Sequence, residues 1–258
     1  MNDLLKLAND GHGGMRRWEQ ISRFRAAASI AGAIWALKGK PGLLEDVVLD
    51  GETRDQRADD NAVPAAGPVY HLGSLPADHR DLRRRDRERR DPAASFAGLT
   101  RHSPWDDLQV AYFAGEANWN YFAAPFILAR PDFVTEETGP WHEDGQTWRS
   151  LLATYPDTIV AHTTQRSYYF DDTGLLRRLD YSVGILGGGP AVHYPSQYRE
   201  FDGIHGPDPA PGPPPQPRWL PGPRLGLDRH RCHQRHLQLG ADPCALTSSP
   251  AGSSPTTS

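Results

Sequence analysis

The residues with the most evident metal chemistry lie in the C-terminal segment DRHRCHQRHLQLGADPC. Its imidazole and thiol side chains belong to His230, His233, His236, Cys232 and Cys244. Zinc binds such groups in tetrahedral sites, which are usually built from closely spaced cysteine pairs. Here the only two cysteines of the chain are twelve residues apart and form no CxxC pair. We therefore expect no metal site.

Three further histidines, His12, His162 and His193, are candidates for acid–base chemistry. His12 is flanked by glycines after a short apolar stretch, a pattern that is typical of a helix end and favours a capping role over catalysis. His162 and His193 fall in segments with strand-like alternation, and their roles stay open. No nucleophile elbow, phosphate-binding loop, zinc-protease motif or dinucleotide-binding motif accompanies them. We accordingly assign no catalytic residue and no cofactor.

A dense set of aromatic side chains is the one feature that indicates binding. Most of them lie in the segment WDDLQVAYFAGEANWNYFAAPFIL, which has an apolar face suited to a helix. The candidate ligand-binding residues are Trp35, Tyr112, Trp119, Phe122 and Phe126. Two interpretations stay open: the rings fill the core, or some of them line an apolar site for a small molecule between a helix and a curved sheet.

The elements that position these side chains can be predicted from the pattern of residues. Asn2 predicts the cap of a short N-terminal helix. Ser103-Pro104, followed by acidic residues, predicts the start of the main helix, with a break near Gly115. Residues 24–37, with many small side chains, are predicted to form one strand.

Four segments after the main helix alternate like strands: residues 147–156, 158–172, 175–186 and 191–204. Turn sequences separate or precede them at Glu143-Asp144-Gly145, Asp171-Asp172-Thr173-Gly174, Gly187-Gly188-Gly189 and Asp202-Gly203. The acid pairs in these turns are expected to be solvated rather than catalytic. The prediction is an α+β fold, in which the aromatic-rich helical segment packs on a curved antiparallel sheet, an incomplete barrel, preceded by an N-terminal helix.

Two segments, 58–90 and 205–258, break this pattern. Seven of the twelve residues from His79 to Arg90 are arginine, and nine prolines fall between Pro207 and Pro223. Both segments can be explained as disorder, or as peptide translated out of frame from a GC-rich gene. Back-translation with a one-base shift restores strand-like sequence in each. We expect both segments to be irregular and residues 1–204 to form a single domain.

The overall charge and hydropathy exclude several classes of protein. The formal net charge is −4 and the sequence pI is about 6.2, so no basic field recruits nucleic acid. No apolar run approaches the ~18 residues of a membrane-spanning helix. The N-terminus has neither the basic region nor the long apolar region of a signal peptide. A cytoplasmic location is expected.

The ordinary parts of the chain, 1–57 and 91–204, resemble an uncharacterised bacterial family that is common in actinobacteria. Segments that carry the resemblance include DGHGGMRRW, IAGAIWALKGKPGLL and GQTWRSLLATYPDTIVAHTTQRSYYFDDTGLLRRLDYSVGILGGGPAVHY. The late strands are also similar to the lipoprotein-carrier fold, a curved half-barrel with helices in its mouth. That second resemblance implies binding of acyl chains but transfers no binding residue.

Three functional hypotheses follow. The first is a non-enzymatic binder or carrier of an apolar small molecule or lipid. The second is a small hydrolase or isomerase that uses His12, His162 or His193. The third is that the chain is a non-functional product of frame shifts, because the loss of several strands would exceed a folding stability of about 5–15 kcal/mol.

Overall fold

The computed structural model describes residues 2–45, 47–54, 56, 93–207 and 231–241. The helical elements are α1 (Asp3–Gly11), α2 (Met15–Trp18), α3 (Ala33–Leu37), η2 (Ala93–Phe96), α5 (Asp107–Ala123), η3 (Phe126–Ala129) and η4 (Gly184–Leu186). The strands are β1 (Ile21–Ala31), β2 (Val47–Glu52), β3 (Val134–Glu143), β4 (Gln146–Thr154), β5 (Gln165–Phe170), β6 (Leu176–Val183), β7 (Gly189–His193), β8 (Tyr198–Phe201), β9 (Ile204–Pro207) and β10 (Arg231–Ala241).

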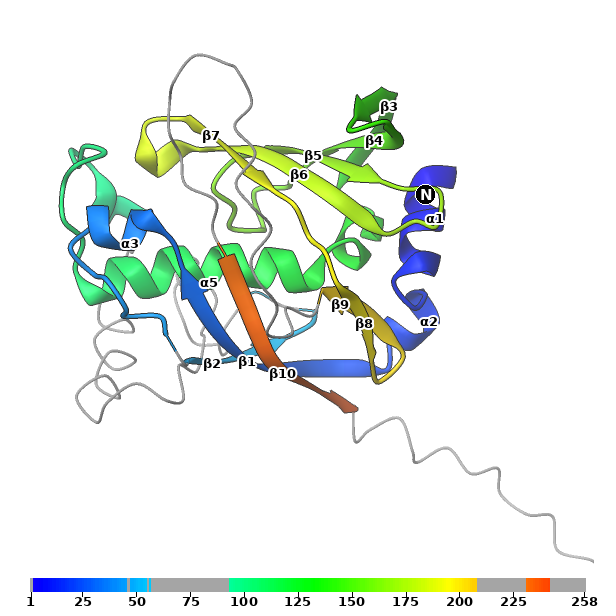
Figure 1. Cartoon of the computed structure of the whole chain (residues 1–258), viewed down its shortest axis with the longest axis horizontal. Coiled ribbons are helices and arrows are strands. Elements are labelled where there is room, and N and C mark those ends of the chain that lie inside the picture. The colour runs from blue at the N-terminus through cyan, green and yellow to red at the C-terminus, as the bar shows by residue number, and fades with distance from the viewer. Residues whose placement is uncertain (1, 46, 55, 57–92, 208–230, 242–258) are drawn as a thin grey trace, which may run out of the picture.

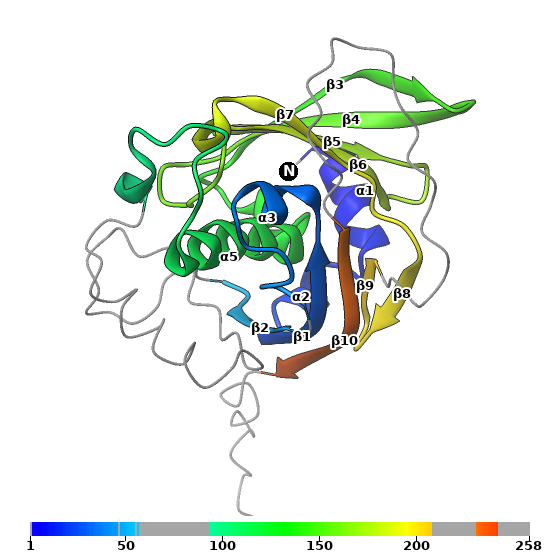
Figure 2. The same ribbon diagram turned by 60° about the vertical axis from the view of Figure 1, so that its left-hand side comes forward.

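Helix α5 lies between two antiparallel sheets. On one side is an open five-stranded sheet with the order β3-β4-β5-β6-β7, and on the other a three-stranded sheet with the order β10-β1-β2 (Figures 1 and 2). The hairpin β8–β9 forms a small third sheet. The predicted α+β class is confirmed, with its N-terminal helix, its antiparallel sheet that does not close, and its helix rich in aromatic residues.

The sequence of α5 suits this central position. Asp106 caps the helix by accepting a bond from the Gln109 N–H at 2.8 Å, and the Gln109 side chain accepts one from the Asp106 N–H at 2.9 Å. The helix therefore starts three residues after the predicted Ser103 cap. The break predicted near Gly115 is wrong, because packing on both faces outweighs the ~1 kcal/mol that a glycine costs inside a helix.

The N-terminal helix α1 is positioned by a close backbone approach. Asn2 caps it as predicted, since its side chain accepts a bond from the Leu5 N–H at 2.8 Å. The predicted turn at residues 171–174 joins β5 to β6 and presses against this helix. A Cβ atom on Gly174 would lie 2.2 Å from the Leu7 carbonyl oxygen, and φ at this glycine is +84°. Only glycine fits the contact.

Two other predicted turns are tight hairpins. Asp144 and Gly145, between β3 and β4, have φ values of 51° and 75°. Asp202 and Gly203, between β8 and β9, have values of 50° and 81°. Consecutive positive φ angles are required by the two-residue turns that match the twist of antiparallel strands. These turns fix the register of the strands that they join.

Two predictions about strands are wrong. Residues 24–37 do not form a single strand, because β1 ends at Ala31 and α3 follows. The prediction that 205–258 is irregular fails for the end of β9 and for residues 231–241, which form β10 along β1. The backbone groups on that edge of β1 need partners, and β10 supplies them over nearly its whole length. The segment 58–90 lies outside the described residues.

His12 follows α1 and has the predicted capping role. Its backbone N–H and its ring Nδ1 lie 3.2 Å and 2.8 Å from the Ala8 carbonyl oxygen. The ring is packed edge-on against Phe126, Phe170 and Tyr198. Burial in this apolar surrounding lowers the pKa of His12 from 6.5 to about 4.

This lowered pKa predicts a loss of stability in acid. Between pH 6.5 and pH 4 the unfolded chain gains a proton on His12 and the folded chain does not, so the free energy of unfolding falls by about 3 kcal/mol. Urea unfolding across this range should show a smaller loss for His12→Gln, because glutamine cannot take up the proton. The exposed His142→Gln is the control. Equal losses in His12→Gln and the unsubstituted chain would show that His12 is not the titrating group.

Candidate functional site

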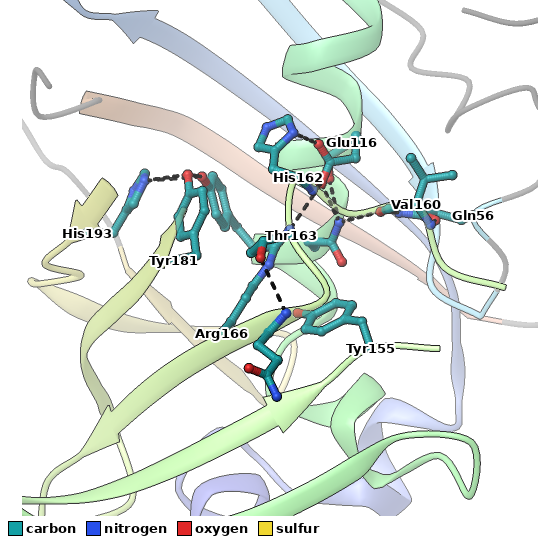
Figure 3. Close-up of polar contacts among 12 residues, drawn as sticks. Gln56, Glu116, Tyr155, Val160, His162, Thr163, Arg166, Tyr181 and His193 are labelled. Carbon is teal, nitrogen blue, oxygen red and sulfur yellow. Dashed lines mark hydrogen bonds and ion pairs between the residues drawn. The ribbon is translucent and has the colours of Figure 1, made fainter. Parts of the chain in front are cut away.

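A buried carboxylate lies at the middle of α5. Glu116 is only 1% exposed and faces the five-stranded sheet (Figure 3). Its Oε2 contacts Nδ1 of His162, and its Oε1 forms an ion pair with Nη2 of Arg166 at 3.1 Å. Oε1 also accepts a hydrogen bond from the backbone N–H of His162 at 2.8 Å. A buried carboxylate is tolerated only with such compensation, so these contacts fix its position.

His162 is not in a strand, as its alternation suggested, but in the loop between β4 and β5. Two amide side chains hold that loop at Val160. Gln56 accepts a bond from the Val160 N–H at 2.6 Å and donates one to the Val160 carbonyl at 2.8 Å. Asn120, one turn after Glu116 on α5, donates to the same carbonyl at 3.0 Å. The imidazole is thereby held against the carboxylate (Figure 3).

Arg166, on β5, is enclosed by aromatic rings. Its guanidinium lies 4.8 Å from the ring centre of Tyr155 and 5.0 Å from that of Tyr181. Burial acts to lower the pKa of Arg166, but the neighbouring Tyr155, Tyr168 and Glu116 together hold it above its ordinary value. The side chain therefore stays cationic, and cation–π contacts add to the ion pair with Glu116.

A hydrogen-bonded group of two phenols and an imidazole adjoins this cluster. The hydroxyl groups of Tyr121 on α5 and Tyr181 on β6 are 2.5 Å apart, and Nε2 of His193 lies 3.2 Å and 3.0 Å from them. Burial raises the pKa of Tyr181 to about 12 and that of Tyr121 well above 10. Both phenols therefore remain protonated hydrogen-bond donors near neutral pH.

Four polar atoms in the cluster are buried and make no hydrogen bond within the described part of the chain. One is Oε2 of Glu116, which contacts Nδ1 of His162. The other three are Nε of Arg166, Nε2 of His162 and Oδ1 of Asn120, and they belong to side chains that contact the Glu116 carboxylate. Leaving a buried polar atom unpaired costs about 1–3 kcal/mol. This local cost is what distinguishes the cluster from an ordinary structural network.

The five predicted aromatic residues lie on α5 or near it, and each contacts a different partner. Trp35 and Tyr112 lie toward its start, against Phe113 and Phe96 respectively. Trp119 donates from Nε1 to the Glu52 carbonyl of β2 at 2.7 Å.

The other two rings lie farther along the chain. Phe122 packs on Phe24 of β1, and Phe126 is stacked on Trp18. Tyr112 and Phe122 are partly buried, whereas Trp35, Trp119 and Phe126 are buried in the core.

The histidine candidates separate into two groups. His162 and His193 are brought to the cluster, and His12 lies apart, at the end of α1. Part of the segment rich in cysteine and histidine forms β10, while His230 and Cys244 lie outside the described residues. Within the described ranges, no three His, Cys, Asp or Glu side chains are grouped to hold a metal ion.

The sequence reasoning missed the charged centre of the site. Glu116 and Arg166 were not identified, nor were the three tyrosines Tyr155, Tyr168 and Tyr181. A signal was present: Glu116 is a single carboxylate in the otherwise apolar and amide-rich stretch AYFAGEANWNYF. A charge in the middle of a helix that is apolar all round must be buried and paired.

Comparison with known proteins gives one structural similarity. No protein family and no curated protein matches the chain. Among solved structures, the chain is similar to a DUF1329 family protein from Desulfovibrio piger, with 13% identity and a TM-score of 0.36. The alignment covers 80% of this chain and 85% of that one. No helix in the described residues is long and apolar enough to cross a bilayer.

The buried ion pair predicts a large effect of one isosteric substitution. Glu116→Gln leaves the Arg166 charge uncompensated, and we expect the free energy of unfolding to fall by about 3–5 kcal/mol in urea titrations. The matched control is Glu137→Gln, which breaks an exposed pair with Arg149 and should cost under about 1 kcal/mol. Adding Arg166→Met to Glu116→Gln should recover part of the loss. Similar values for Glu116→Gln and the control would contradict the assignment.

Proposed function

We propose that the chain is a non-enzymatic binder of a small amphipathic molecule, held between α5 and the five-stranded sheet. The observation that supports this function is the set of unpartnered atoms around Glu116, on Arg166, His162 and Asn120. In a layer that is otherwise apolar, a ligand with a polar group would satisfy these atoms and bury its apolar part against aromatic rings. Small-molecule sites commonly combine a few placed polar groups with an apolar lining.

The apolar contacts are assigned to the aromatic residues of α5 and its neighbours. The five candidates remain Trp35, Tyr112, Trp119, Phe122 and Phe126, but Trp119 and Phe122 contact β2 and β1 of the three-stranded sheet. The ring of α5 that adjoins the cluster is Phe113, which stacks on His162 with ring centres 4.2 Å apart. Tyr112 and Phe122 are the most accessible of these rings, since each keeps part of its surface exposed. Burial of a large aromatic side chain against a ligand contributes about 1.5–3 kcal/mol.

Entry of a ligand requires a local movement. Glu116 and Arg166 are each 1% exposed, and the His162 side chain is 3% exposed. A ligand therefore reaches these groups only when α5 separates locally from β5 and β6. The unpaired atoms reduce the cost of that opening, because fewer favourable bonds are lost.

A second candidate function is hydrolysis or isomerisation at His162. The observation that favours it is that Glu116 holds Nδ1 of this imidazole while Nε2 has no partner. A carboxylate that orients a base in this way is the arrangement found in enzymes that use histidine as a general base.

The test of this candidate is hydrolysis of 4-nitrophenyl acetate and butyrate by the full chain. A rate that falls about 100-fold or more in His162→Gln would support it. An unchanged rate in that variant, or no turnover at all, would exclude hydrolysis of these esters by His162.

The domain organisation is also a proposal. We propose one α+β domain over residues 1–204, related to an actinobacterial family and to the lipoprotein-carrier fold. A separate alternative is that 58–90 and 205–258 are out-of-frame peptide, in which case the chain as written would be a non-functional product. The pairing of β10 with β1 weighs against this origin for residues 231–241. Resequencing the gene decides between the alternatives.

The binding proposal predicts displacement of a neutral fluorescent probe. Decyl compounds with different polar groups should displace N-phenyl-1-naphthylamine from the full chain, because both would occupy the apolar layer. Phe113→Ala should weaken probe binding about 5–10-fold, because the Phe113 ring stacks on His162 at the cluster and its contact with the probe would be lost. Val134→Ala, at an exposed position of β3, is the control and should bind normally. Failure of every decyl compound and of the probe to bind would refute this function.

A further inference from the structure

We infer that the polar group of the ligand is uncharged and both donates and accepts hydrogen bonds, as an alcohol or a primary amide does. This inference rests on the proposed binding function and names the chemical class of its ligand. It follows from the hydrogen-bonding capacity that the cluster around Glu116 leaves unused.

The unused capacity contains at least one donor and one acceptor. Nε of Arg166 carries a hydrogen and can only donate. Oδ1 of Asn120 can only accept. The orientation of this amide is fixed, because Nδ2 of Asn120 lies 2.9 Å from the Glu116 carbonyl, 3.2 Å from Glu116 Oε1 and 3.0 Å from the Val160 carbonyl, all of which are acceptors. A ligand that satisfies both atoms needs an acceptor and a donor.

The two side chains meet at one oxygen of the Glu116 carboxylate. Arg166 Nη2 and Asn120 Nδ2 contact the same oxygen, Oε1 of Glu116, at 3.1 Å and 3.2 Å. His162, on the other carboxylate oxygen, adds Nε2, which accepts as a neutral imidazole and donates when protonated. A hydroxyl group or a carboxamide can both donate and accept hydrogen bonds, as these atoms require.

The charge balance disfavours an ionic group. The Glu116 carboxylate is already compensated by the Arg166 guanidinium within the protein. A carboxylate ligand would add a buried negative charge without a free cation and would leave Oδ1 of Asn120 unpaired. An ammonium ligand would leave Nε of Arg166 unpaired. Either mismatch carries the desolvation cost of a buried group without a partner.

The test compares four ligands of the same chain length on the full protein at pH 8. They are 1-decanol, 1-methoxydecane, decanoate and decylammonium, each titrated by displacement of N-phenyl-1-naphthylamine. Decanol should bind about tenfold or more tightly than each of the others. The ether is the sharpest comparison, because it is uncharged and accepts but cannot donate. Decanamide should behave like decanol.

A variant tests whether Arg166 is responsible. Arg166→Lys keeps a cation beside Glu116 and removes the Nε–H, so the preference for decanol over decylammonium should shrink about tenfold. A purely structural role for Arg166 would weaken all ligands together and leave this ratio unchanged. The exposed Arg149→Lys is the control. The ligand series on the unsubstituted chain decides the matter if Arg166→Lys does not fold.

The outcomes separate the two proposals. Tightest binding of decanol supports the inference. Binding of decanoate, decylammonium or the ether as tightly as decanol overturns the inference and leaves the binding function standing. Failure of all the ligands to bind overturns both.

Discussion

The burial of one carboxylate inside α5 constrains the rest of the structure. Glu116 is placed where an apolar side chain would ordinarily pack, so its negative charge must be compensated within the protein. A guanidinium from β5 provides that compensation, and an imidazole from the preceding loop contacts the other carboxylate oxygen. Their positions in turn require the enclosing tyrosines and the amides that hold the loop. The position of α5 along the sheet is therefore fixed by the Glu116–Arg166 ion pair as well as by side-chain packing.

The position of α5 between two sheets explains the composition of the helix. Its residues are buried on nearly every side, and its aromatic side chains contact both sheets: Phe122 meets β1, while Tyr121 meets β6. A helix with one solvated face could not carry this sequence without exposing large apolar rings. The aromatic density is therefore required by packing, and any ligand must share surface that already stabilises the fold.

Local sequence signals predicted the elements but not the way they meet. The α1 cap at Asn2 and the hairpin turns at Asp144 and Asp202 depend on a few adjacent residues, and they were predicted correctly. The start of α5 was misplaced, because a proline-containing candidate cap precedes the actual capping box at Asp106. The continuity of the helix through Gly115 was missed, since it depends on contacts from both sheets.

The polar site was harder to predict for the same reason. His162 and His193 were recognised as candidates, but Glu116 and Arg166 are fifty residues apart and meet only when the sheet covers the helix. A single sequence does not specify such a pairing. The strand β10 was also missed, because its partner β1 lies about two hundred residues earlier. Both errors concern contacts between segments that are distant along the chain.

The two bonds between Gln56 and Val160 connect regions that otherwise belong to different sheets. Gln56 lies just beyond β2, and Val160 lies in the loop that carries His162. The Gln56 amide bonds both the N–H and the carbonyl of Val160, as a neighbouring strand would. It thereby links the layer that contains β2 to the loop that follows β4. Displacement of β2 would therefore shift the loop and reorient the imidazole, so the geometry of the buried cluster depends on the position of β2.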